Sequence, residues 1–163
     1  MRLFFALIPE PDLILRIEDW RARQLRLSAR PVPPQNLHVT LYFCGENDAE
    51  QTRALVSRAR RVEAPILSMP LNTFGYFANT GIAWIGPDRT HDGVNNLAKQ
   101  LATRSERRYT PHLTLFRGVR EPPPPPLMSP QFELNCDSFA LMSSTRNHKG
   151  VRYEPLEIFP LHP

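Results

Sequence analysis

The sequence predicts an α+β fold: one two-lobed domain, residues 1–163, in which mostly antiparallel sheets surround a central cleft and helices lie outside. Apolar segments typical of strands alternate along the chain with amphipathic segments typical of helices. The order strand, helix, strand occurs twice, and each time the second strand carries a His-x-Thr-x motif, "HVTL" at 38–41 and "HLTL" at 112–115. The repeat indicates an internal duplication, whose two halves would be related by a pseudo-twofold axis.

The composition is that of a folded domain and favours an anionic ligand. With 41% hydrophobic and 22% charged residues, the 163-residue chain can bury a substantial core and does not resemble a disordered protein. The formal net charge is +4, and Lys99 and Lys149 are the only lysines, so arginine supplies nearly all of the positive charge. Guanidinium groups suit phosphates and base faces, which favours a nucleotide or RNA; a solvated arginine surface is the alternative.

The remaining global features predict a cytoplasmic monomer without a membrane partner. The apolar run within residues 1–11 is too short for a signal-peptide core, and no later stretch approaches the ~18 apolar residues of a membrane span. Cys44 and Cys136 lack the spacing of metal ligands and are expected to be reduced, structural thiols.

The first half of the chain begins with a strand, a helix and a second strand. Residues 2–8 form a short apolar run stopped by proline, which predicts a buried strand. Residues 11–26 place apolar side chains at helical spacing after a proline suited to a first turn. The proline-rich stretch 30–35 ends that helix, and the β-branched and aromatic residues of 37–43 predict the next strand.

The middle of the chain predicts a helix followed by a hairpin. Residues 48–62 are polar and helical in pattern, and Asp48 is a good N-cap. Residues 66–77 and 80–87 are typical of strands, and the turn-forming stretch 78–81 between them predicts a hairpin.

The second half repeats the helix and the motif strand, and then adds a hairpin. Residues 90–106 form an amphipathic pattern that leads into the strand 111–117. The run 121–130 predicts a stiff polyproline connector, with a ligand for a proline-binding module as the alternative. The tail 132–161 predicts two strands around a turn at 146–150.

Each motif places an imidazole and a hydroxyl on one face of its strand. Side chains at i and i+2 share a face, so His38 and Thr40 point one way while Val39 and Leu41 point into the core. The same alternation holds for 112–115. If the halves pack about a pseudo-twofold axis, both polar pairs converge on one cleft.

Two facing imidazoles suit the hydrolysis of a phosphodiester. Unperturbed imidazole titrates near pKa ~6.5, so His38 and His112 are candidates for the general acid and the general base. The hydroxyls of Thr40 and Thr114 can donate to phosphoryl oxygens. No metal or other cofactor is predicted, because neither motif brings an Asp, Glu or Cys beside its histidine. A core histidine would be the better interpretation of either motif alone, and the repetition favours the catalytic one.

At this point the sequence resembles the two-histidine (2H) phosphoesterase superfamily and, within it, the bacterial RNA 2',3'-cyclic phosphodiesterases, formerly called 2'-5' RNA ligases. The start "RLFFAL", the segments "NLHVTLYFCGE" and "PHLTLFR", and the ending "SSTRNHKGVRYEPLEIFPL" follow in the order of that group. The resemblance covers nearly the whole chain. One departure is the short "TRSE" segment before Arg108, where family members usually carry a longer loop.

The resemblance implies roles for the motif residues. His38 would protonate the departing ribose 3'-oxygen and His112 would activate water, leaving a 2'-phosphate; the reverse assignment stays open. Thr40 and Thr114 would hold the phosphoryl oxygens. Arg117 would reach the phosphate or stack on the base, with a surface arginine at the end of a strand as the alternative.

Two aromatic residues and three further histidines complete the candidates. Phe5 and Tyr153 are considered for a nucleoside pocket, with the core or the rim of the cleft as the alternative. His91, His148 and His162 lie in turn or terminal contexts and are expected at the surface.

Three hypotheses for the activity follow. The first is metal-independent hydrolysis of 2',3'-cyclic phosphates of RNA or nucleotides. The second is 2'-5' RNA ligation at the same site. The third is a module that binds RNA ends without turnover. A small cyclic phosphate is an alternative substrate to RNA.

Overall fold

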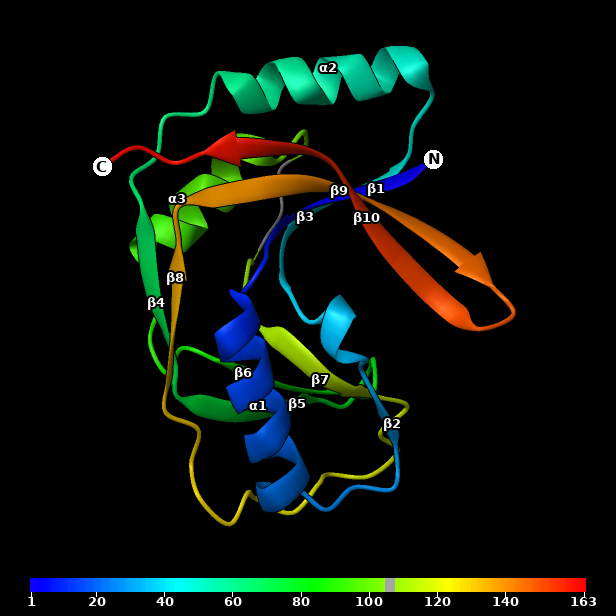
Figure 1. The fold of residues 1–163 in the computed structure, drawn as a ribbon, viewed down its shortest axis with the longest axis vertical. Helices are drawn as coiled ribbons and strands as arrows, with labels where there is room; N and C mark the ends of the chain where they lie inside the picture. The colour runs from blue at the N-terminus through cyan, green and yellow to red at the C-terminus, as the bar shows by residue number, and fades with distance from the viewer. Residues whose placement is uncertain (105–107) are drawn as a thin grey trace.

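The computed structural model describes residues 1–104 and 108–163, and it has the α+β architecture that the sequence predicts (Figure 1). Its described helices are α1 (Pro11–Gln24), α2 (Ala49–Arg60), α3 (Asp92–Leu101) and the short 3-10 turn η1 (Pro34–Asn36). Its described strands are β1 (Arg2–Leu7), β2 (Arg30–Pro31), β3 (Val39–Glu46), β4 (Leu67–Leu71), β5 (Thr73–Phe77), β6 (Ile82–Gly86), β7 (Leu113–Arg117), β8 (Phe132–Cys136), β9 (Ser138–Asn147) and β10 (Gly150–Pro160).

One large antiparallel sheet carries both motifs. Its strand order is β10-β9-β1-β3-β7-β6-β5, with β2 paired to β7, while β4 and β8 form a separate two-stranded sheet. The two motif strands, β3 and β7, lie side by side at the centre, where Val39 pairs with Leu113. The sheet therefore consists of two halves that meet between the motifs.

The predicted duplication is confirmed by the pairing of the strands. In the first half β1 pairs antiparallel with β3, and in the second half β6 pairs antiparallel with β7. A helix separates the strands of each pair in sequence, α1 in the first and α3 in the second. Each half is thus strand, helix, motif strand, as the sequence indicates.

The helix of each half packs on the strands of the other half. Helix α3 packs on β3 of the first half, whereas α1 lies over the strands of the second half (Figure 1). The buried Arg21 of α1 fixes this position, because its guanidinium donates to the carbonyls of Val32 at 2.8 Å and of Leu115 in β7 at 3.0 Å. Each half is therefore covered by the other half's helix and is poorly suited to fold alone.

Local sequence explains the helices. Helix α1 begins at Pro11 and buries Leu13 and Ile17, while α3 buries an almost continuous apolar face. Helix α2 lies at the surface, where a capping box starts it: Gln51 N donates to Asp48 Oδ1 at 2.7 Å and Asp48 N donates to Gln51 Oε1 at 2.8 Å. The predicted N-cap at Asp48 is confirmed.

Three predicted boundaries are wrong. The single strand expected over 66–77 is two strands, because β4 leaves at Asn72 to pair with β8 in the second sheet. The tail 132–161 contains three strands instead of two, since β8 precedes the predicted hairpin. The helix expected over 90–106 ends at Leu101, the last residue of its apolar stripe. The short "TRSE" segment before Arg108 is described only as far as Arg104, and residues 105–107 lie outside the described residues.

The proline-rich stretches behave in two ways. The connector 121–130 has no helix or strand, as predicted, and it runs beside the end of α1, where Trp20 Nε1 donates to the carbonyl of Met128 at 3.1 Å. The stretch 30–35, expected only to end a helix, also supplies the edge strand β2, which pairs with β7. Within the described residues, no helix has both the length and the apolar character needed to cross a membrane.

Candidate active site

The sheet brings the two motifs together on one face. Because Val39 pairs with Leu113 in antiparallel register, His38 lies across from Thr114 and Thr40 lies across from His112. We call the side of the sheet that carries these four side chains the histidine face. Val39 and Leu113 point to the opposite side and are fully buried in the core. The alternation predicted for both motifs places all four candidates as expected.

Both histidine rings are held by the same local contact. His38 Nδ1 lies 2.7 Å from the carbonyl oxygen of Asn36, and His112 Nδ1 lies 2.8 Å from the carbonyl oxygen of Thr110. A carbonyl only accepts, so Nδ1 carries the proton in each neutral ring and Nε2 is the proton acceptor. Each motif thus presents the same nitrogen for chemistry, and His38 Nε2 lies 2.8 Å from Thr40 Oγ1.

Aromatic rings surround His38. The ring of Phe4 lies 5.0 Å from the imidazole and that of Tyr153 lies 5.2 Å from it, edge-on. Tyr153 therefore stands at the site, as considered from the sequence. Phe5 does not, because it is fully buried and packs against Phe139 and Phe159 in the core. The pocket role considered for Phe5 is wrong, and its neighbour Phe4 occupies that position.

The second half repeats the arrangement around His112. Phe77 meets the imidazole edge-on at 5.1 Å, and Trp84 lies 6.0 Å away. Trp84 reaches this position because residue 75 is glycine: a Cβ there would be 2.1 Å from the indole. Each imidazole is therefore packed against two aromatic rings that also contact each other, with centroids 5.0 Å apart in both pairs.

The register of β1 against β3 explains why Phe4, and not Phe5, lies at the site. Ala6 pairs with Thr40, so Ala6 and Phe4 share the histidine face. Leu41 has no partner in β1, because Phe5 pairs with Tyr42. This bulge reverses the alternation of β3 beyond Leu41, so Phe43 points to the histidine face. Simple alternation puts Phe43 in the core. The structure leaves it 66% exposed.

Two cavities flank the histidines, and Phe43 lines both. A 340 Å³ cavity lies beside His38 and a 270 Å³ cavity lies beside His112. The first is lined by Arg2, Phe4, His38, Arg117, Arg146 and Tyr153, among others. The second is lined by Thr40, Tyr42, Phe77, Arg108, Thr110 and His112, among others.

Arg117 belongs to the His38 cavity although it lies on the strand of His112. Because β7 runs antiparallel beside β3, the end of β7 reaches the first half, where Arg117 lines the cavity together with Arg146. This placement is compatible with the phosphate contact that the resemblance implies. Arg2 and Arg146 are further cations of the cavity, which the sequence reasoning missed.

The surroundings lower the pKa of both histidines. Burial is the main cause for His38 and lowers its pKa from 6.5 to about 4; the carbonyl of Asn36 opposes this, and the charges of Arg117 and His112 add to it. Burial also lowers the pKa of His112, opposed by the carbonyl of Thr110 and supported by Arg117. Both rings are therefore neutral at pH 7 in the free protein, and an anion bound between them would raise both pKa values.

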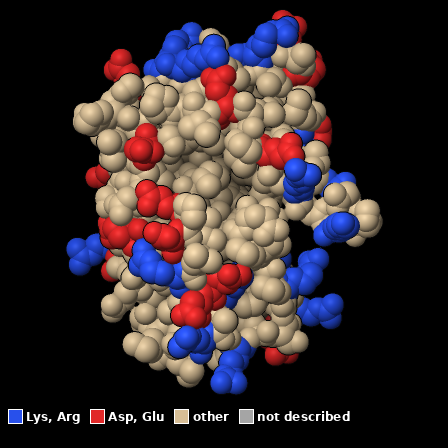
Figure 2. Space-filling model, in the orientation of Figure 1, with Lys and Arg blue, Asp and Glu red and all other residues tan. Residues whose placement is uncertain are grey.

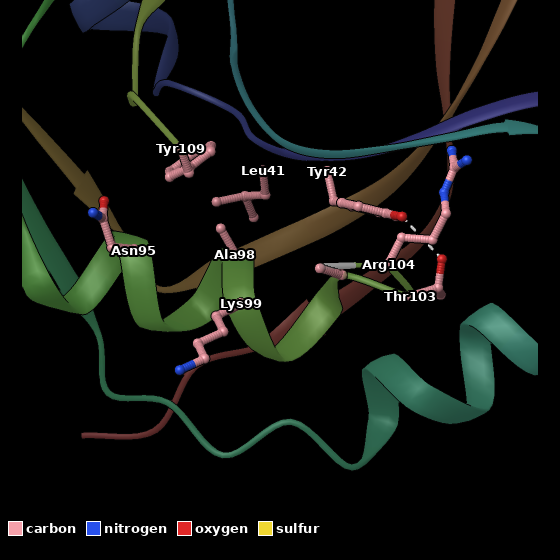
Figure 3. A pocket seen from close by; sticks show the side chains of 9 residues that line it. Leu41, Tyr42, Asn95, Ala98, Lys99, Thr103, Arg104 and Tyr109 are labelled. Atoms are coloured by element: carbon pink, nitrogen blue, oxygen red, sulfur yellow. Dashed lines mark hydrogen bonds between the residues drawn. The ribbon is translucent and has the colours of Figure 1, made fainter. Parts of the chain in front are cut away.

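A third cavity of 510 Å³ lies between α3 and β3, next to the His112 cavity (Figure 3). The two share Leu41, Tyr42 and Tyr109. The hydroxyls of Tyr42 and Thr103 form a hydrogen bond with 2.9 Å between the two oxygens, drawn as a dashed line in Figure 3. Tyr109 donates its hydroxyl to the carbonyl of Thr40 at 2.8 Å, so it fixes the backbone of the first motif.

The other histidines and the cysteines lie away from this site. His91 caps α3, where its Nδ1 accepts from Val94 N at 3.1 Å, while His148 and His162 are exposed. Cys44 and Cys136 are free thiols whose pKa values burial raises to about 11 and about 12. Within residues 1–104 and 108–163, no three His, Cys, Asp or Glu side chains gather as metal ligands.

The chain is similar to curated enzymes over almost its full length. It is 32% identical over 171 residues to the RNA 2',3'-cyclic phosphodiesterase of Escherichia coli, covering 98% of this chain and 96% of that protein. It is 33% identical over 181 residues to the RNA 2',3'-cyclic phosphodiesterase of Thermus thermophilus, covering 99% of this chain and 90% of that protein.

Solved structures agree with this similarity. The crystal structure of E. coli LigT complexed with phosphate superposes with a TM-score of 0.89 at 33% identity, covering 99% of this chain and 98% of that one. The complex of LigT with 3'-AMP gives a TM-score of 0.86 at 32% identity, covering 98% and 97%. The model of the 2'-5' RNA ligase superfamily matches residues 9–148. With both motifs inside the matched region, the chain belongs to the 2'-5' RNA ligase superfamily.

Proposed function

We propose that the protein hydrolyses the 2',3'-cyclic phosphates of RNA ends and leaves a 2'-phosphate. The observation that supports this most is the pair of equivalently held imidazoles on the histidine face, each across from the other motif's threonine. The relatives of similar length are RNA 2',3'-cyclic phosphodiesterases. E. coli LigT, which has this fold, has been crystallised with phosphate and with 3'-AMP.

In the proposed reaction, one histidine takes a proton and the other gives one. His112 Nε2 removes a proton from water while the water oxygen bonds to phosphorus. The bond from phosphorus to the ribose 3'-oxygen breaks, and His38 Nε2 donates its proton to that oxygen. One water is consumed, and a proton passes from His112 back to His38 through solvent before the next turnover. The resemblance supplies this assignment; the matching contacts of the two rings are equally compatible with the reverse.

The other polar groups would bind the phosphate. Thr40 and Thr114 would donate to the non-bridging oxygens, whose charge grows in the transition state. Arg117, which lines the His38 cavity, would offset the negative charge from that side. Burial lowers the pKa values of both histidines, and the negative charge of the bound phosphate would raise them. The histidine that acts as the acid would therefore take up its proton from solvent when the substrate binds.

We propose that the reaction needs no metal, because acid, base and phosphate contacts all come from these side chains. The test is turnover of a 2',3'-cyclic nucleotide in excess EDTA, with the product identified by phosphorus NMR. Full activity and a 2'-phosphate are expected. Loss of activity in chelator that a divalent ion restores, or a 3'-phosphate product, would contradict the proposal. No turnover of any cyclic phosphate would favour a module that binds RNA ends.

A second activity is supported by the second cavity. The 270 Å³ cavity beside His112 offers room for a nucleoside with a free 5'-hydroxyl, which is the partner needed for 2'-5' ligation. Water at ~55 M outcompetes a dilute hydroxyl unless that hydroxyl is bound beforehand, so hydrolysis should dominate. We further propose that the chain acts as one domain and as a monomer in the cytoplasm, which sedimentation and fractionation would test.

A further inference from the structure

Three adjoining cavities form a series that begins at His38. The 340 Å³ His38 cavity shares Arg117, Arg146, Val151 and Tyr153 with a neighbouring 460 Å³ cavity. That cavity shares Arg30 with another of 740 Å³, which ends at the connector. We call the last two together the basic groove, because its cationic lining residues are Arg26, Arg30, Arg117, Arg120, Arg146 and Lys149. Glu121 is its acidic lining residue.

The groove places like charges against each other without compensation. Arg30 of β2 lies directly opposite Arg117 of β7 in the register of the sheet. Like charges in this arrangement destabilise a sheet. In the part of the chain that the structure describes, Arg30, Arg117, Arg146 and Lys149 form no salt bridge. Such a cost is offset when an anionic ligand binds between the cations.

The hairpin of β9 and β10 carries an arginine on each of its faces, and within the described part of the chain only the one on the outer face forms a salt bridge. Arg146 and Val151 pair across the hairpin and both line the groove, so this face looks inward. Arg152 pairs with Thr145 on the other face and forms a salt bridge with Glu154 at 2.9 Å. Figure 2 shows basic side chains on this hairpin, which projects from the body of the molecule. The unpaired cations thus lie on the side that faces the groove.

The chemistry of the proposed substrate decides what the groove would hold. A 2',3'-cyclic phosphate occupies both the 2'- and the 3'-oxygen of the last ribose, so the RNA chain can continue only through the 5'-oxygen. A strand whose end lies at His38 must therefore leave the site in one direction. The basic groove begins in the same cavity and offers cations along that route.

We propose that the basic groove binds the single-stranded RNA that precedes the terminal nucleotide, so that the enzyme prefers RNA ends to mononucleotides. This inference rests on the function proposed above. A cationic groove that follows the backbone is the usual means of holding a single strand without reading its sequence. An acidic protein segment would also suit the charge, but it would have no reason to begin at the histidines.

The test compares two substrates that differ only in their length. One is a 2',3'-cyclic mononucleotide, and the other is an oligoribonucleotide of about eight nucleotides that ends in the same cyclic nucleotide. The variant is Arg30→Ala combined with Lys149→Ala, and the control is Arg152→Ala, which removes a cation from the outer face of the same hairpin. We expect the variant to raise KM for the oligonucleotide about tenfold or more and to change KM for the mononucleotide less than about twofold.

Salt dependence gives an independent measurement. The slope of log(kcat/KM) against log[salt] should be steeper for the oligonucleotide than for the mononucleotide. For every phosphate that the variant no longer neutralises, that slope should become shallower by about 0.7. Arg152→Ala should leave the slope within error of the wild type.

The outcomes separate the groove from the proposed function. If the variant weakens turnover of both substrates equally, or of neither, the groove proposal is wrong, while turnover of the mononucleotide still upholds the function. If neither substrate is hydrolysed by the wild type, the function fails. Anisotropy with a labelled oligonucleotide that ends in a 3'-hydroxyl then tests the groove alone. Tighter binding of a polyglutamate peptide than of that oligonucleotide would overturn the RNA assignment in favour of an acidic protein.

Discussion

Val39 and Leu113 pair across the centre of the sheet, and both side chains are fully buried. They stand between the histidine and the threonine of their own motifs, so the pair sets the register of the histidine face. As a result each histidine faces the threonine of the other half. A complete site therefore exists only when both halves are folded and joined at this pair.

Replacing either histidine should reduce turnover strongly without unfolding the chain. His38→Asn and His112→Asn remove the ring nitrogen Nε2 that each motif presents. Each should lower kcat on a 2',3'-cyclic nucleotide by roughly 10²–10⁴-fold, the usual effect of losing one general acid or base. Steady-state kinetics gives the loss, and circular dichroism checks the fold.

The double variant distinguishes a catalytic pair from two separate effects. His38→Asn combined with His112→Asn should lose far less than the product of the single losses, because residues that act together are not additive. A single variant that unfolds, yet keeps its activity per folded molecule, would show that its histidine belongs to the core.

The pH profile should lie on the acid side of neutrality. The productive free enzyme carries one proton on the histidine pair, and both histidines have pKa values below 6.5. Above that pH the singly protonated form declines, so kcat/KM should fall about tenfold per pH unit. The kcat profile should peak at higher pH, because the bound phosphate raises both pKa values. A kcat/KM that is flat between pH 5 and 8 would contradict this prediction.

Arg117 offers a directed change of that profile. Burial is the main cause of the low pKa values, and the charge of Arg117 lowers both further. Arg117→Ala should therefore move the maximum of kcat/KM to higher pH while raising KM, whereas Arg117→Lys should keep the position of the maximum. Identical pH profiles for the alanine and lysine variants would show that the charge does not act on the histidines.

The features of the site that the sequence predicted are those that depend on local alternation. His38, Thr40, His112 and Thr114 share a face because a strand has a period of two, and the repeat shows that the strands are related. The strand, helix, strand order of each half likewise follows from the local spacing of apolar residues along the chain. These features need no knowledge of the tertiary contacts.

The features that the sequence did not predict depend on register and on contacts between halves. Phe43 reaches the histidine face through a bulge at Leu41, which no period-two pattern contains. Phe4 replaces Phe5 because the pairing of Ala6 with Thr40 decides which side of β1 faces the site. Arg146 joins the His38 cavity through the pairing of β9 with β1.

The low pKa of His38 also predicts how stability depends on pH. The folded pKa is about 4 and the unfolded value is near 6.5, so the unfolded chain binds the extra proton between these values. The contribution is fully present above pH 6.5 and is lost as pH falls toward 4, on the order of 3 kcal/mol in total. In His38→Asn this loss should be absent. Urea unfolding at several pH values, compared with the wild type, would reveal the difference, and parallel curves for the two proteins would refute it.

A substrate with a better leaving group should separate the roles of the two histidines. The ribose 3'-oxygen is a poor leaving group and needs the proton of the general acid, whereas para-nitrophenolate departs without one. If His38 is the acid, His38→Asn should lose roughly 10²–10⁴-fold on the cyclic nucleotide but about tenfold or less on bis(para-nitrophenyl) phosphate. His112→Asn should lose similar factors on both substrates, because the attacking water needs its base in each reaction. The wild-type rate on each substrate is the reference, and Thr114→Val, which removes a hydroxyl that contacts neither ring, is the control. The opposite pattern, in which His112→Asn loses little on bis(para-nitrophenyl) phosphate, would reverse the assignment. His38 would then be the base, a role that suits its pKa of about 4, which keeps the ring neutral.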